Sequence, residues 1–165
     1  MLPKTAQRWL QRLDLLLLVA IIGFTLVVII QAVSSVPQVW PYLILRQVHN
    51  EVGRLGLALA VLMLALAVYI GIIRKGDVTP LFRRATYIIF GTVLAQALVG
   101  LGMYTGFNAR PAEDVHIIYG LGTVLSLPFF IFVETTAKKR PAMGSYIWGF
   151  ALMAGIILRS ILTGG

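Results

Sequence analysis

Residues 49–73 read HNEVGRLGLALAVLMLALAVYIGII, and this stretch decides the fold class. A bilayer core of about 30 Å needs about 20 apolar residues per helix. The stretch exceeds that length and carries charge only near its start, at Glu51 and Arg54. The whole chain has the same character: 59% of its 165 residues are hydrophobic, 12% are charged, and its mean hydropathy is +0.90. These values predict an all-α integral membrane protein.

Apolar stretches that approach or reach the length of a span occur at residues 15–33, 49–73, 85–104, 116–133 and 146–162. We therefore predict a single transmembrane domain, residues 1–165, in which a four-helix transmembrane bundle is followed by a fifth C-terminal transmembrane helix. The fifth stretch is the shortest and carries Arg159 near its end. Four spans plus one peripheral helix is the alternative.

The distribution of lysine and arginine predicts the orientation. The N-terminal segment and the second and fourth connections fall on one side of the membrane, and they hold ten of the fourteen basic residues: Lys4, Arg8, Arg12, Arg74, Lys75, Arg83, Arg84, Lys138, Lys139 and Arg140. Basic connections remain cytoplasmic. We predict a multi-pass protein of the cell (inner) membrane with a cytoplasmic N-terminus and an outer C-terminus.

The net charge of +8 has the same explanation. Because the basic residues border helix ends, they indicate topology and contact with anionic membrane lipid, and no nucleic-acid partner is expected. The chain has no cysteine. This excludes disulfides, iron–sulfur clusters, thiolate zinc sites and covalent attachment of a c-type heme.

The only two histidines, His49 and His116, stand at the outer start of the second and fourth predicted spans. Each is followed four residues later by a glycine, Gly53 and Gly120. Positions i and i+4 share a helix face, so each imidazole has bare backbone beside it. Two neutral imidazoles in a dry helical bundle suit a flat iron porphyrin, heme b, with both histidines as iron ligands.

Other uses of these residues remain open at this point. Each histidine could form a structural hydrogen bond to a neighbouring helix, and the pair could serve a proton relay or another metal. Zinc or copper would normally need a third protein ligand, for which Glu51 and Asp114 are the nearest candidates. The glycines could simply allow close helix packing.

Four further polar residues are candidates for contact with the cofactor. Arg46, Arg54 and Arg110 lie at the outer face, where heme propionates would point, and arginine binds carboxylates well. They are equally suited to be interfacial anchors. Gln96, deep in the third span, could hydrogen-bond across helices or approach the cofactor edge.

The residues Arg46-Gln-Val-His49-Asn-Glu-Val-Gly53-Arg54-Leu resemble the histidine-bearing second helix of the heme A synthase family. The segment Gln96-Ala-Leu-Val-Gly100-Leu-Gly102-Met-Tyr-Thr is similar to that family's glutamine-and-glycine helix, and His116 stands where its next axial histidine would. The resemblance covers residues 15–133, one four-helix half of a two-half protein. It implies a b-type heme held by His49 and His116 near the outer face.

The resemblance does not extend to catalysis. Members that oxidise the heme methyl group have a carboxylate three residues before the first histidine, where this chain has Arg46. The paired cysteines of an outer loop and the second half are also missing, and Glu51, two residues after His49, points about 200° around the helix.

We therefore predict a small membrane b-type cytochrome that transfers electrons as a subunit of a larger redox complex. Its expected partners are other membrane subunits or a second copy of the chain, with a membrane quinol or an extracytoplasmic electron carrier as the redox partner. One alternative is a half-length enzyme related to heme A synthase that acts as a dimer. Another is a non-redox structural or pigment-binding subunit of a respiratory or photosynthetic complex.

Overall fold

The computed structural model describes residue 16 and residues 19–31, 41–137 and 142–164. All regular secondary structure in this part of the chain is helical. After an N-terminal helix, Val19–Gln31, come α2 (Pro41–Val68), its π-helical continuation η1 (Tyr69–Ile73), α3 (Pro80–Gly106), α4 (Val115–Ala137) and α5 (Met143–Gly164).

Four helices are long and apolar enough to cross a membrane, and they span 33, 27, 22 and 22 residues at Pro41–Ile73, Pro80–Gly106, Val115–Thr136 and Met143–Gly164. The predicted all-helical, multi-pass membrane protein is confirmed at this level. The helix Val19–Gln31 is apolar but shorter. Residues 15, 17–18 and 32–33 of the first predicted span lie outside the described residues, as do Lys4, Arg8, Arg12, Lys138, Lys139 and Arg140.

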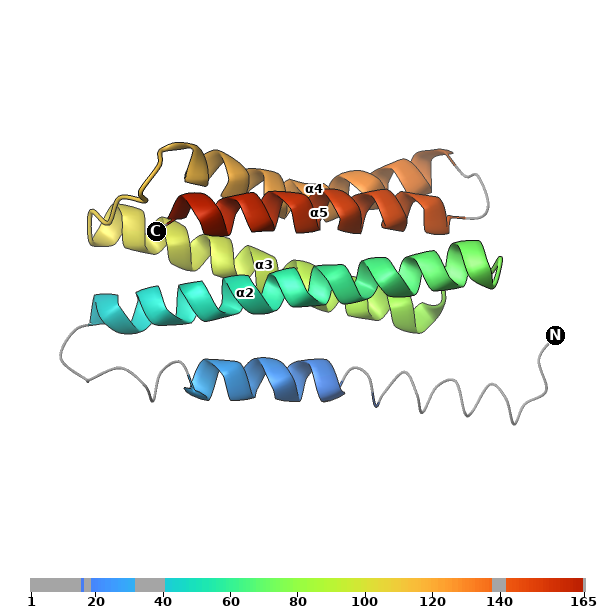
Figure 1. Cartoon of the computed structure of the whole chain (residues 1–165), viewed down its shortest axis with the longest axis horizontal. Helices are drawn as coiled ribbons and strands as arrows, with labels where there is room; N and C mark the ends of the chain where they lie inside the picture. The colour runs from blue at the N-terminus through green and yellow to red at the C-terminus, as the bar shows by residue number, and fades with distance from the viewer. Residues whose placement is uncertain (1–15, 17–18, 32–40, 138–141, 165) are drawn as a thin grey trace.

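The four long helices form an up-and-down bundle in which each helix packs against the next, and α5 closes the ring against α2 (Figure 1). Within the described residues, α2 makes no close backbone contact with α4, and α3 makes none with α5. These two pairs are therefore diagonal. The fifth predicted span, α5, is thus one of the four helices of the bundle. The prediction that the first four spans form the bundle, with the fifth as an addition to it, was wrong in this respect.

Small residues explain why α5 packs so closely. A Cβ on Gly149 would lie 3.2 Å from Cβ of Phe130 on α4, and a Cβ on Gly71 would lie 2.7 Å from Cγ of Met143. Glycine at these positions lets the neighbouring helices approach one another. The prediction from the sequence did not include these helix-to-helix contacts, because they depend on which faces meet.

The helices also begin earlier than the predicted spans. The largest difference is in α2, which begins at Pro41, two turns before His49. Hydropathy marks where an apolar run begins, whereas helical hydrogen bonding here continues outward through the exposed Arg46. α3 begins at Pro80, where the Thr79 side chain accepts a hydrogen bond from the backbone N–H of Phe82 at 3.1 Å.

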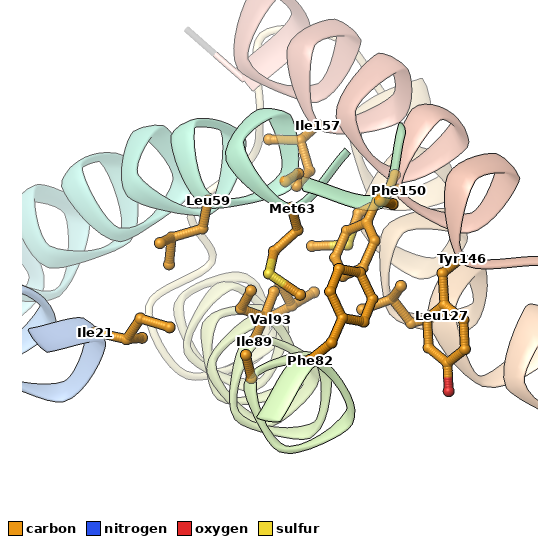
Figure 2. Close-up of a cluster of buried hydrophobic side chains, with 14 of the residues drawn as sticks. Ile21, Leu59, Met63, Phe82, Ile89, Val93, Leu127, Tyr146, Phe150 and Ile157 are labelled. Carbon is orange, nitrogen blue, oxygen red and sulfur yellow. The ribbon is translucent and has the colours of Figure 1, made fainter. Parts of the chain in front are cut away.

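The apolar core (Figure 2) has large aromatic side chains near the end of the bundle opposite the histidines and extends as far as Val93 and Ile157, which also line the cavity beside the histidines. Phe82 of α3 packs edge-on against Tyr146 and Phe150 of α5, with ring centroids 5.4 and 6.0 Å apart. Met63 of α2 and Leu127 of α4 complete the contact between the four helices. Large side chains at this end leave the other end to smaller ones.

One ion pair joins α3 to α4 at this end. Nη2 of Arg83 lies 2.8 Å from Oε1 of Glu134, whose side chain is 7% exposed, whereas that of Arg83 is 40% exposed. The buried hydroxyl of Tyr146 on α5 interacts with the same carboxylate. Arg83 supplies the positive charge that compensates it.

Replacing Arg83 with methionine is expected to lower the free energy of unfolding by about 3 kcal/mol, because breaking a buried pair leaves an uncompensated charge. Unfolding in mixed detergent micelles measures this change. The matched control is Arg84→Met, which alters the adjacent, exposed arginine and is expected to change stability by about 0.5 kcal/mol or less. Adding Glu134→Gln to Arg83→Met is expected to restore much of the loss. Equal stability of the Arg83→Met and Arg84→Met variants would contradict the role of the pair.

Candidate functional site

The two histidines face each other across the bundle from the diagonal helices α2 and α4. Their ring centroids are 6.1 Å apart, and the ring planes are inclined by 63°. His116 lies in the first turn of α4, and His49 lies in the third turn of α2. Because α2 extends two turns further outward, the rings meet at the same level although their positions within their helices differ.

A cavity of about 160 Å³ lies beside the two rings and has its walls on all four helices. Of the residues predicted for the site, it is lined by His49, His116, Gly53, Gly120, Arg54 and Gln96. The two glycines that follow the histidines thus lie on the cavity wall, as i+4 spacing requires. A Cβ added to Gly120 would meet nothing within 4 Å, so this wall is bare.

The arginines are distributed unequally. Arg54 lines the cavity mouth and forms an exposed ion pair with Glu51, with Nη1 of Arg54 at 3.0 Å from Oε1 of Glu51. Arg46 and Arg110 are exposed and are not among the lining residues. Only one of the three arginines predicted to meet propionates therefore borders the cavity.

His116 is held by α5. Its Nδ1 lies 2.9 Å from the backbone oxygen of Ser160 and 3.3 Å from Oγ of the same residue. A carbonyl oxygen can only accept, so Nδ1 carries the hydrogen and donates it. The neutral ring then keeps a lone pair on Nε2. This arrangement is typical of histidines that bind a metal through Nε2 while an outer partner fixes the tautomer.

His49 is held differently. The side-chain amide of Gln96 on α3 donates a hydrogen bond to the backbone oxygen of His49. Its Nδ1 is buried and has no hydrogen-bond partner among the described residues. Gln96 thus fixes the α2 backbone at this position and leaves the ring without a polar contact at Nδ1.

Two glycines that were not predicted to touch the rings lie directly against them. A Cβ on Gly100 of α3 would be 2.8 Å from Cε1 of His49, and a Cβ on Gly164 of α5 would be 2.8 Å from Cε1 of His116. Such distances are too short for any real Cβ, so both positions need glycine for the rings to lie where they do. The i+4 spacing within one helix indicates Gly53 and Gly120. Gly100 and Gly164 contact the rings from other helices, and no sequence spacing predicts such a contact.

The donor set is small. Within residues 16, 19–31, 41–137 and 142–164, no group of three His, Cys, Asp or Glu side chains comes together. Glu51 instead pairs with Arg54, and Asp114 lies exposed in the loop before α4. The two imidazoles therefore form a pair, with centroids 6.1 Å apart, beside a largely apolar cavity, and a cofactor that supplies its own further metal ligands suits such a pair.

Comparison of the chain with protein-family models, with curated proteins and with solved structures finds no match.

Proposed function

We propose that this protein is a small membrane b-type cytochrome that binds one heme b between His49 and His116 and transfers electrons as a subunit of a larger redox complex. The observation that carries the proposal is the opposition of the two rings at 6.1 Å. An imidazole nitrogen binds a first-row metal ion at about 2 Å, so the centroids of two rings on opposite sides of one ion lie roughly 6 Å apart. The spacing of these rings suits axial ligation.

The chain's own groups have distinct parts in this proposal. His116 presents Nε2 because Ser160 accepts the hydrogen of its Nδ1. Gln96 fixes the backbone that carries His49. Gly53 and Gly120 expose backbone on the cavity wall, so a flat ring can lie close to the helices. When bound, heme supplies a reversible one-electron couple, and two histidine ligands favour electron transfer over substrate chemistry at the iron.

The size of the cavity sets a condition on the proposal. A porphyrin is larger than 160 Å³, so heme binding would also need the space on the open side of the cavity. Arg54 lines the cavity, and its guanidinium could bind a propionate in place of Glu51. Arg46 and Arg110 are not needed for this role.

The orientation of the protein is also part of the proposal. The histidines lie at the end of the bundle opposite the exposed Arg74, Lys75 and Arg84. Basic residues favour the cytoplasmic side, which puts the heme site near the outer face. A membrane quinol or an extracytoplasmic electron carrier would be within reach there.

The enzyme alternative has less support. Oxidation of a heme substrate in the manner of heme A synthase would need a carboxylate near the first histidine, and Arg46 occupies the corresponding position and is exposed. Among the residues that the structure describes, no Asp or Glu lines the cavity. Electron transfer therefore fits these residues better than oxidation of the porphyrin.

Potentiometric titration of the heme-loaded protein tests the function. We expect a single reversible transition that follows a one-electron Nernst curve, because a single heme site gives one redox couple. Mass spectrometry of the extracted heme after repeated cycling is the companion measurement. Unaltered heme b supports electron transfer, whereas a hydroxylated heme, or a heme that cannot be cycled, contradicts it.

A further inference from the structure

The two histidines have unequal support from the rest of the chain. His116 lies where the start of α4 is joined to the last turn of α5. The backbone N–H of Glu113 donates to the oxygen of Thr163 at 3.1 Å, and that of Ala112 donates to the oxygen of Gly164 at 3.5 Å. The ring itself donates to Ser160 at 2.9 Å. The backbone around His116 and its imidazole are thus bound to the same turn.

His49 lacks this support. Its backbone is hydrogen-bonded to Gln96, but its Nδ1 is buried and has no hydrogen-bond partner in the part of the chain that the structure describes. The ring is held in place by packing, which includes close contact with Gly100. A buried polar atom without a partner costs free energy, and a ring without an outer acceptor has no hydrogen bond to fix its tautomer.

We propose that His116 is the fixed axial ligand and His49 the exchangeable one, so that a small neutral iron ligand, either carbon monoxide or free imidazole, binds on the α2 side by displacing His49. This inference rests on the proposed heme site. Hydrogen bonding to the outer nitrogen strengthens a histidine as a ligand, and loss of such a partner typically costs about 10- to 100-fold in metal affinity. Exchange breaks one iron–nitrogen bond and forms one bond to the new ligand, with no change of oxidation state.

Heme retention by the two single variants tests the inequality. His49→Ala is expected to keep heme on His116 in a five-coordinate, high-spin form that binds carbon monoxide when reduced and becomes low-spin with free imidazole. His116→Ala is expected to bind heme about tenfold or more weakly than His49→Ala. Equal retention, or better retention by His116→Ala, would overturn the assignment.

A second measurement does not depend on heme. In the heme-free protein, ¹⁵N NMR of the imidazoles is expected to show His116 protonated at Nδ1, and Gly164→Ala is expected to disturb that signal because its Cβ would meet the ring. Gly155→Ala is the matched control on α5, since a Cβ there meets nothing within 4 Å. A His116 protonated at Nε2 would overturn the inference and leave the proposed function standing, whereas an unmodified protein that binds no heme, with Nδ1 protonated, would refute the proposed function and leave only the unequal hydrogen bonding of the two rings.

Discussion

Neither His49→Ala nor His116→Ala is expected to show the low-spin, six-coordinate heme spectrum of the unmodified protein. Each change removes one of the two opposed rings, and within the described residues no third His, Cys, Asp or Glu side chain joins them. Loss of a residue that hydrogen-bonds to a metal ligand lowers metal affinity by about 10- to 100-fold. Loss of the ligand itself is expected to lower the affinity for heme in the six-coordinate state by at least as much. Absorption and electron paramagnetic resonance spectra measure the result.

The control for these variants is Ile118→Ala. Ile118 lies two residues after His116 and is 67% exposed, so its side chain faces away from the cavity. It is expected to retain a full low-spin spectrum. If both histidine variants also retained it, the two histidines would be helix-packing residues and the ligand assignment would be wrong.

Gly100→Ala is expected to weaken heme binding by about 10- to 100-fold, the range found when the orientation of a metal ligand is disturbed. The added Cβ would lie 2.8 Å from Cε1 of His49, so the ring must move. The fold is expected to survive, because alanine has a helix propensity about 1 kcal/mol better than glycine. Heme titration and thermal unfolding of the same sample measure the two effects.

A loss of heme affinity without loss of the fold makes the test specific. Gly102→Ala is the matched control two residues further along α3, where a Cβ meets nothing within 4 Å. It is expected to bind heme like the unmodified protein. Equal heme affinity of the two variants would show that the position of the His49 ring does not matter for binding.

The helices and the pairing of the histidines were accessible from the sequence for a simple reason. Long apolar runs specify membrane helices, and short connections make successive helices antiparallel, so the starts of the second and fourth spans must lie at one end. His49 and His116 therefore had to lie at a similar depth. The i+4 spacing likewise predicted that Gly53 and Gly120 lie on the wall of the cavity beside the histidines.

The neighbours of the rings on other helices were not accessible. Helices that are apolar on every side give little sign of which face turns inward, so the contact of Gly164 with His116 could not be predicted from residues 146–162. The importance of α5 was missed for the same reason. Its Ser160 oxygen is a backbone group, and no side-chain pattern reports a backbone acceptor.

The most direct test of the central claim is a reduced-minus-oxidised absorption spectrum of the detergent-purified protein, with a pyridine hemochrome assay to identify and count the heme. We expect one heme b per chain with a sharp low-spin α-band, because two opposed imidazoles supply both axial ligands. A colourless protein that also fails to take up added heme would contradict the account and leave His49 and His116 as residues of helix packing.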